Sequence, residues 1–436
     1  MSARWWAWWG CLLVLAAGAA GGEAVEEVPV GQAGIFSIAD FGAKSDGKSD
    51  DTAAIQAAID KAAEKGGVVW VPPGQWLVAG SLAVKPGVAV VGANQAPLSI
   101  EPLTGSIILA TGGRDNEQAP ALFELGSAST VRGITVFYPE QKPREIHPYP
   151  WTFHLQGFDN TVENVTLINS YNGISVGPEG NVRHRIRSVY GCVLRRGLVV
   201  DACTDIGRVE NVQWHCHFWS AASIGGEWQP VFDYMVEHLE AFVFGRTDWE
   251  YVTNTFVFPT NIGYRFIKTK AGACNGQFSG IGADAAQTCV LVDEVQYMGL
   301  LISNGQFVAF TGRRPVELVV SPTCTGQVRL VNCAFWGPAS YNALLQGKGP
   351  VSLSDCFFSG RNEAAEKAKH PLMVAEAGRL QVHNCTFSGE APAIRLGPGV
   401  TYAQISGNNG DHGVSVDNQA GKRAVIKDNE AAPKSD

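Results

Sequence analysis

A short pattern of residues recurs along the chain and restricts its fold more than any other feature. It reads apolar, any residue, Asn or Asp, apolar, any residue, apolar, and it occurs at 162–167, 209–214, 330–335, 353–358 and 382–387. The Asn-like positions Asn304, Asn332, Asp355 and Asn384 follow one another at 28, 23 and 29 residues. A period of about 20 to 30 residues is typical of a solenoid, in which each repeat packs on its neighbours.

The repeat units predict strands rather than helices. Apolar and polar residues alternate within each unit, and the helical period of 3.6 residues is absent from the pattern. Short strands that bury one face against a stacked neighbour build a parallel β-helix. An Asn at each corner tolerates the left-handed backbone conformation and can stack on the Asn of the next rung. We therefore predict an all-β parallel β-helix.

Cys333, Cys356 and Cys385 share one position of the repeat. Stacked rungs lie about 4.8 Å apart, a spacing that is compatible with a disulfide. The alternative is a column of buried free thiols that pack as small hydrophobic side chains. The chain has 10 cysteines, and Cys11 lies in the N-terminal apolar stretch. Because an odd number then remains, complete pairing is disfavoured and we expect free thiols.

The segment 36–92 predicts a helix between glycine-rich turns and short buried strands. Asp50 or Asp51 can cap the helix at its N-terminus, and Gly66-Gly67 can end it. One apolar face of this helix could plug the open end of a solenoid. The residues of that face are Ile55, Ala58, Ile59 and Ala62.

The same segment closely resembles the opening of the pectate-lyase superfamily, in its rhamnogalacturonase/epimerase-like branch. The resemblance rests on 36–44, on 50–59 and on the run Gly66-Gly67-Val68-Val69-Trp70-Val71-Pro72-Pro73-Gly74. It implies a right-handed parallel β-helix with an N-terminal capping helix, and a polysaccharide-binding groove along one of its sheets. Hydrolases, lyases, epimerases and phage tailspikes share this opening, so the resemblance leaves the reaction undetermined.

We predict a signal peptide at 1–22, followed by one β-helix domain at 30–430. Arg4, the apolar stretch 5–20 and the small residues that end it support the signal peptide. The protein would then be secreted or periplasmic, with no membrane segment after signal removal. The domain divides into a cap at 30–95, an extended rung at 215–252 and plain C-terminal rungs at 300–430.

The extended rung predicts one helical insertion. It separates Asn211 from Asn254 by 43 residues, almost twice the usual spacing. Apolar residues recur in it at helical spacing, at Phe232, Met235, Val236, Leu239, Phe242 and Val243.

The composition narrows the partners of the protein. The net charge is −8 and no Lys/Arg run stands out, so nucleic acid is excluded as the expected partner. A polysaccharide is the expected partner, and both a monomer and a trimer remain open.

Residues suited to sugar chemistry are concentrated between 147 and 250. Aromatic rings can stack on sugars, arginine pairs can bind carboxylates, and carboxylates can supply an acid and a base. The predicted catalytic residues are Asp201, Asp205, Glu227 and Asp233. The predicted substrate-binding residues are Trp151, His154, Tyr171, Asn172, Arg195, Arg196, Trp228 and Asp248.

Three functions fit these residues. The first is a glycoside hydrolase that uses paired carboxylates. The second is a lyase or epimerase acting on uronates, in which arginines neutralise a carboxylate. The third is a carbohydrate-binding protein without catalysis, because the Asn-Thr-Asp, Asp-Asp and Gly-His-Gly motifs of polygalacturonases are absent. We predict no metal site and no cofactor, with calcium conceivable for a lyase; His215-Cys216-His217 lacks an evident third ligand.

Overall fold

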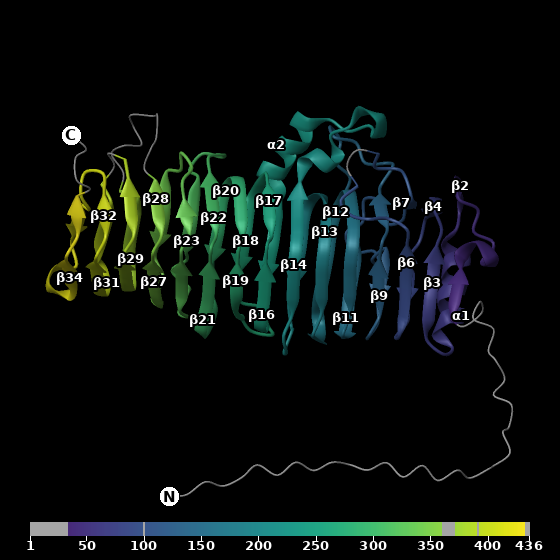
Figure 1. Cartoon of the computed structure of the whole chain (residues 1–436), viewed down its shortest axis with the longest axis horizontal. Helices are drawn as coiled ribbons and strands as arrows, with labels where there is room; N and C mark the ends of the chain where they lie inside the picture. Colours follow the sequence, from purple (N-terminus) through teal and green to yellow (C-terminus); the bar gives the residue numbers. More distant parts are fainter. Residues whose placement is uncertain (1–33, 99–100, 360–370, 390–391, 432–436) are drawn as a thin grey trace, which may run out of the picture. The chain divides into compact units, whose positions relative to one another are not determined.

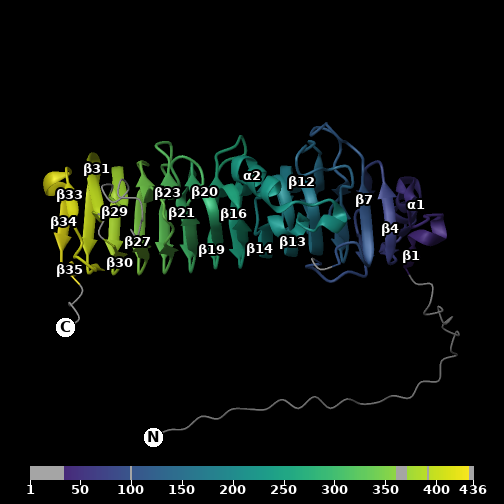
Figure 2. The same cartoon turned by 90° about the horizontal axis from the view of Figure 1, so that it is seen from above.

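The computed structural model describes residues 34–98, 101–359, 371–389 and 392–431. The predicted signal peptide at 1–22 lies outside these residues. From Gly34 onward the described residues form one unit, in which parallel strands stack rung on rung (Figure 1). This confirms the predicted right-handed parallel β-helix, which Figure 2 shows from above.

The strands pair in three parallel stacks. The first stack, called the groove sheet below, is β5 (Leu82–Val84), β8 (Phe123–Leu125), β11 (Trp151–Phe158), β12 (Thr161–Val182), β13 (Arg185–Val200), β15 (Glu240–Phe244), β18 (Thr260–Phe266), β20 (Gly282–Val292), β23 (Val316–Val320), β26 (Tyr341–Leu345), β29 (Met373–His383), β31 (Ile394–Ser406) and β33 (Val416–Asn418).

The second stack shares β12, β13, β29 and β31 with the first. Its other strands are β1 (Ile35–Ser37), β3 (Gly67–Val71), β6 (Val88–Gly92), β9 (Thr130–Arg132), β14 (Arg208–His215), β16 (Thr247–Thr253), β19 (Cys274–Ser279), β21 (Val295–Ser303), β24 (Val328–Val331), β27 (Pro350–Ser354) and β34 (Ala424–Lys427).

The third stack shares β12, β13, β14 and β20 with the others. Its remaining strands are β2 (Asp46–Asp50), β4 (Gly74–Val78), β7 (Ser106–Ala110), β10 (Thr135–Phe137), β17 (Phe256–Phe258), β22 (Gln306–Ala309), β25 (Ala334–Phe335), β28 (Phe357–Ser359), β30 (Thr386–Ser388), β32 (Asn409–Gly410) and β35 (Glu430–Ala431).

The Asn-like positions of the repeat form the predicted corners. All of them have positive φ between 53° and 56°, the left-handed region that Asn tolerates better than most residues. They are Asn164, Asn211, Asn254, Asn304, Asn332, Asp355 and Asn384. The predicted stacking occurs where the side-chain Nδ2 of Asn332 donates to Oδ1 of Asn304 at 2.8 Å. A local residue preference thus sets where each rung turns.

The cysteine column is confirmed as buried free thiols. Cys333, Cys356 and Cys385 are each at most 2% exposed and unpaired by disulfides. Two residues after each cysteine, a buried ring joins a second column, in which Phe358 stacks between Phe335 and Phe387 with ring centroids 4.9 and 5.1 Å away.

The capping helix α1 (Thr52–Ala63) buries the predicted face of Ile55, Ala58, Ile59 and Ala62. The capping contacts differ in detail from the expectation. Asp51 occupies the N-cap position without a side-chain cap, because its Oδ1 accepts from the backbone N–H of Lys44 at 2.8 Å. Asp50 accepts from the backbone N–H of Thr52 at 3.0 Å and takes that capping role.

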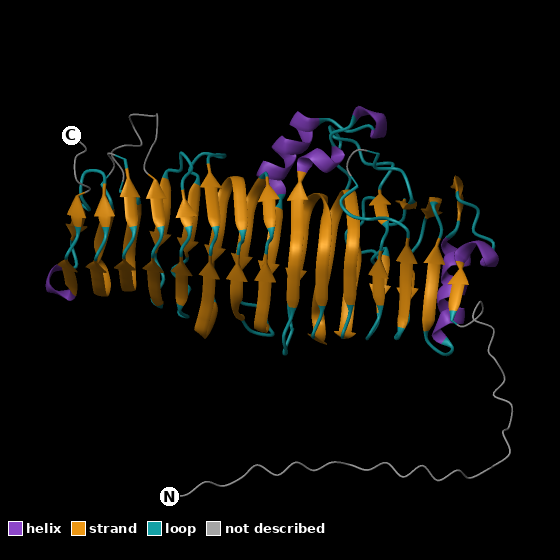
Figure 3. Cartoon of the chain, in the orientation of Figure 1, coloured by secondary structure: helices purple, strands orange, loops and turns teal. Residues whose placement is uncertain are grey.

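The helical insertion is confirmed as α2 (Trp228–His238), at one edge of the coil (Figure 3). The predicted helix is too long, however. Leu239 ends it, and Phe242 and Val243 belong to β15, where pairing with β13 and β18 overrides the helical spacing of the sequence. Within the described residues, no helix is long and apolar enough to span a membrane.

Candidate active site

One row of outward-facing side chains crosses the groove sheet. In β11, Phe153 and Leu155 are buried in the coil, so His154 between them faces outward. The strand register places Glu124 of β8 and Ser175 of β12 beside His154. Neighbouring strands lie about 4.8 Å apart, which brings these side chains within contact distance.

A depression of about 770 Å³ lies over β8, β11, β12 and β13. The structure brings four predicted substrate-binding residues together in its lining: Trp151, His154, Asn172 and Arg196. It adds three carboxylates that the sequence analysis did not select: Glu117, Glu124 and Glu179. Acidic, cationic and aromatic groups therefore share one concave surface.

His154 is held between two carboxylates. Its Nδ1 lies 2.7 Å from Oε2 of Glu124, and its Nε2 lies 3.1 Å from Oε2 of Glu179. Burial by itself would lower the pKa of His154, but the hydrogen bonds and charges of Glu124 and Glu179 outweigh burial and raise it. The imidazolium form donates from both nitrogens and satisfies both carboxylates. His154 is therefore suited to carry a proton into the depression.

Glu124 is held in the ionised form by the same contacts. Burial tends to raise its pKa, yet the hydrogen bonds from His154 and from the backbone N–H of Ala121, at 2.8 Å, lower it overall. The pair thus combines a protonated ring with an ionised carboxylate.

Arg196 is a free cation in the depression. Its register neighbours on the adjacent strands are Asn172 and Glu240, and Glu240 is occupied by Arg265, whose Nη1 lies 2.7 Å away. Within the described part of the chain, the exposed Arg196 side chain has no hydrogen bond or ion pair. A free guanidinium can receive a carboxylate through two parallel hydrogen bonds.

A second depression of about 720 Å³ continues on the other side of Arg196, which lines both. Its floor includes Arg265, whose guanidinium bridges Glu240 at 2.7 Å and Asp293 at 3.0 Å. The exposed Lys268 also lines it. The two depressions together are called the groove below.

Tyr171 and Arg195 connect the groove to the inserted helix. Burial raises the pKa of Tyr171, and the nearby Tyr234 of α2 and Glu117 raise it further, so the phenol stays neutral. Arg195 donates from Nη1 to the backbone carbonyl of His238 at 3.1 Å and holds the end of α2. Both predicted residues lie beside the groove, and neither lines it.

Asp201 and Asp205 lie in turns outside the groove. Asp201 Oδ1 accepts from the backbone N–H groups of Ala202 and Arg246 and from the Thr269 hydroxyl, each at 2.8 Å. Asp205 is exposed, and its carboxylate lies 3.6 Å from Arg183. Asp201 therefore has a turn-forming role that occupies its oxygen, and neither carboxylate reaches the groove.

Glu227 and Asp233 lie on the inserted helix segment, also outside the groove. Glu227 pairs with Arg144, with 2.6 Å between Oε2 and Nη2. The exposed Asp233 accepts from Nε2 of Gln229 at 2.8 Å. The structure thus does not bring the four predicted catalytic carboxylates together, because each is attached to a different turn or helix face.

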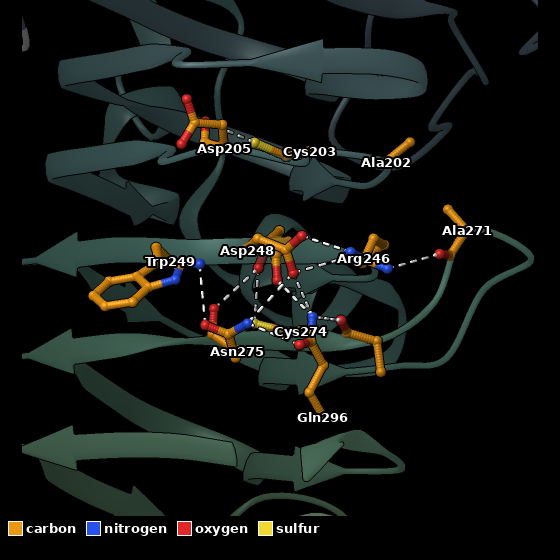
Figure 4. A network of polar contacts seen from close by, with 12 residues as sticks. Ala202, Cys203, Asp205, Arg246, Asp248, Trp249, Ala271, Cys274, Asn275 and Gln296 are labelled. Carbon is orange, nitrogen blue, oxygen red and sulfur yellow. Dashed lines mark hydrogen bonds and ion pairs between the residues drawn. The ribbon is translucent and has the colours of Figure 1, made fainter. Parts of the chain in front are cut away.

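Trp228 and Asp248 are also outside the groove lining. Trp228 is 42% exposed and packs near Phe258, with ring centroids 6.2 Å apart. Asp248 accepts from Nη2 of Arg246 and from Nε2 of Gln296, both at 2.6 Å (Figure 4). The network in Figure 4 stabilises a corner of the coil and occupies the Asp248 carboxylate.

The missed residues Glu124 and Glu179 had a partial signal in the sequence. Glu124 stands between Phe123 and Leu125, which alternate as in a half-buried strand, and it precedes His154 by one rung. The rung period could have paired these two residues. Glu179 lies in β12, between Val176 and Asn181, where the register with β11 shifts. The sequence does not reveal that shift.

Metal-ligating side chains converge elsewhere in the described residues, at His184, Cys203 and Glu250. None of these three lines the groove.

Residues 35–118 match the family model described as rhamnogalacturonase A/epimerase, pectate lyase-like. The match covers the N-terminal part of the described residues, and there the resemblance predicted from the cap is confirmed.

Two proteins of Azotobacter vinelandii share short segments with the chain. The mannuronan C5-epimerase AlgE3 is 45% identical over 89 residues, which are 19% of this chain and 5% of that protein. Alginate lyase 7 is 41% identical over 97 residues, which are 19% of this chain and 11% of that protein. The chain thus matches a small part of the length of these relatives.

Solved structures share the fold at low sequence identity. The A-module of mannuronan C-5 epimerase AlgE4 from Azotobacter vinelandii is 16% identical, with a TM-score of 0.51 over 90% of this chain and 100% of the module. DFA-IIIase from Arthrobacter chlorophenolicus A6 is 11% identical, with a TM-score of 0.58 over 90% of this chain and 98% of that enzyme. The N-terminal fragment of bacteriophage phi29 gene product 12 is 13% identical, with a TM-score of 0.58 over 86% and 66%.

Proposed function

We propose that the protein acts on a uronate-containing polysaccharide, as a lyase or a C5 epimerase that removes the proton α to the substrate carboxylate. The unpaired Arg196 guanidinium in the groove is the observation that carries this proposal. The names of the matched relatives, an epimerase and a lyase of uronate polymers, support the same reaction class.

Arg196 would bind the uronate carboxylate. Removal of the α-proton places a second negative charge on this group, and a bidentate guanidinium stabilises that charge. Glu240 lies beside Arg196 on the next strand and could compete with the substrate for it. Glu240 instead pairs with Arg265 at 2.7 Å, which leaves Arg196 available to the substrate. The interaction would therefore strengthen as the reaction proceeds.

Glu117 is the proposed base and His154 the proposed acid. Glu117 lines the depression, and its Oε2 lies 3.5 Å from Nδ2 of Asn172, the register neighbour of Arg196. His154 carries its proton between Glu124 and Glu179 and can return a proton to the substrate. In a lyase this proton goes to the leaving glycosidic oxygen. In an epimerase a proton returns to C5 from the opposite face.

The hydrolase predicted first from the sequence is less well supported. It requires two carboxylates across the scissile bond. Asp201, Asp205, Glu227 and Asp233 lie outside the groove, and two of the three carboxylates in the first depression, Glu124 and Glu179, are bound to His154. The lyase or epimerase alternative needs a cation, a base and a proton donor, for which the groove offers Arg196, Glu117 and His154. The predicted secretion or periplasmic location, and calcium as an aid to a lyase, remain proposals.

The first experiment is to incubate the full chain with polymannuronate, polygalacturonate and a neutral glucan in D₂O. A lyase produces an unsaturated sugar end that absorbs ultraviolet light, and an epimerase places deuterium at C5, which NMR detects. We expect one of these signals on a uronate polymer and neither on the glucan. New reducing ends without unsaturation, or no product on any polymer, would contradict the proposal.

The variants His154→Gln and Glu117→Gln identify the proton-transfer groups. Loss of a positioned acid or base lowers the rate by about 10²–10⁴-fold. Arg185→Ala is the matched control, because Arg185 is exposed on the same strand as Arg196 and outside the groove lining. Equal losses in all three variants would show a general effect on folding.

A further inference from the structure

Three potential metal ligands meet inside the coil, at residues contributed by three different rungs. His184 lies between β12 and β13, Cys203 follows β13, and Glu250 lies in β16. Their side chains are at most 1% exposed. One ligand atom of each lies within 4.8 Å of the other two, and His184 Nε2 lies 3.1 Å from Glu250 Oε1.

Gly207 makes this meeting possible. The strand register pairs Arg185 with Arg208 and Arg208 with Tyr251, so the preceding residues His184, Gly207 and Glu250 occupy one position on successive rungs. A Cβ at Gly207 would collide with the His184 ring and with Oε2 of Glu250. The missing side chain leaves room for the groups from the rungs on either side.

The cluster has unsatisfied polar atoms. Glu250 Oε2 and His184 Nδ1 are buried without a hydrogen-bond partner. Cys203 Sγ has a weak contact of 3.7 Å with the backbone carbonyl of Asp205. An unpartnered buried carboxylate oxygen destabilises the folded state, so a cation that binds here would stabilise the fold.

We propose that His184, Cys203 and Glu250 bind one divalent transition-metal ion of the zinc class. Imidazole nitrogen, thiolate and carboxylate are the ligands that zinc takes, at about 2.0–2.3 Å, so ligand atoms of one ion stand about 3.3–3.8 Å apart. The ligand atoms lie within 4.8 Å of one another, so the ion would have to draw them together by about 1 Å. Binding releases the thiol proton and the proton shared by His184 and Glu250.

The ion would have a structural role. Its two charges would be neutralised by the Cys203 thiolate and the Glu250 carboxylate. The unpartnered Glu250 Oε2 would supply the fourth ligand atom that a site closed to solvent needs. It would tie three successive rungs together from within. This role is independent of the chemistry proposed for the groove, because none of the ligands lines the groove.

Metal analysis of the full chain tests the proposal. The protein is purified, dialysed against a chelating resin and analysed for bound metals, and a second batch is produced in medium with cobalt in place of zinc. We expect about one ion per chain and, in the cobalt protein, the near-ultraviolet charge-transfer band of a thiolate–cobalt bond.

Cys203→Ser should remove the charge-transfer band and most of the metal. Cys289→Ser is the matched control, because Cys289 is equally buried and makes a similar 3.7 Å contact to a backbone carbonyl. A wild-type protein with neither metal nor band, even after refolding with excess zinc or cobalt, would overturn the proposal and leave a dry His184–Glu250 ion pair. A band that persists in Cys203→Ser would also overturn it.

Discussion

Replacement of Arg196 by Ala is the most informative test of the groove. The guanidinium is exposed and unpaired, and the nearest acidic register neighbour, Glu240, keeps its own partner Arg265 at 2.7 Å. The substitution therefore leaves no buried group without a partner, and we expect the free energy of unfolding to change by less than about 0.5 kcal/mol. A change in ligand affinity can then be attributed to the lost contact.

The expected loss of affinity follows from the exposure of Arg196. A hydrogen bond to a charged group contributes about 1.5–3 kcal/mol, and solvent screening at an exposed side chain favours the lower end. A loss of about 1.5 kcal/mol raises the Kd for a uronate oligosaccharide about tenfold. Arg196→Lys retains the charge but loses the bidentate geometry, so its loss should be intermediate.

Isothermal titration calorimetry with a uronate oligosaccharide and a neutral oligosaccharide of equal length measures both effects. Arg185→Ala should bind like the wild type, because Arg185 lies outside the groove lining. If Arg196→Ala binds the uronate as tightly as the wild type, the guanidinium does not receive the carboxylate. An equal loss for the neutral oligosaccharide would point to shape rather than charge and would refute the reasoning.

Three further predictions concern the proton donor and the scaffold. The pKa of His154 is raised from its usual value of 6.5 mainly by Glu124, so both activity and the stabilising pair should be lost as pH rises through the raised pKa. Glu124→Gln should move the alkaline limb of the kcat/KM profile to lower pH; an unchanged limb would exclude His154 as the acid. Asn332 has φ +53°, so Asn332→Ala should lower the free energy of unfolding by about 1–2 kcal/mol and Asn332→Gly by less, as measured by urea denaturation. Phe358 is fully buried, so Phe358→Ala should cost about 3–5 kcal/mol, whereas the adjacent Phe357, 38% exposed, should tolerate Ala far better. Equal midpoints of thermal unfolding for these two variants would show that Phe358 does not face the interior of the coil.

The scaffold could be predicted in detail because its signals are local. An Asn corner is set by the backbone preference of one residue, and the buried face of α1 is set by spacing within a single helix. The error at α2 is instructive for the same reason. Phe242 and Val243 fit a helical pattern locally, but their pairing with neighbouring rungs makes them a strand.

The sequence alone determined the β-helix, its cap, its insertion and four residues of the groove, namely Trp151, His154, Asn172 and Arg196. These follow from patterns within one rung or from one rung to the next.

The tertiary structure alone decided which carboxylates meet His154. Glu124 meets it through the register of β8 and β11, and Glu179 meets it where the register of β11 and β12 shifts between Val176 and Asn181. Asp201 was predicted to be catalytic, but its carboxylate accepts hydrogen bonds from Arg246 and Thr269 in a turn. The sequence does not reveal these contacts. The physical reason is that a groove is made by side chains from several rungs and loops, so rung length and register decide its composition.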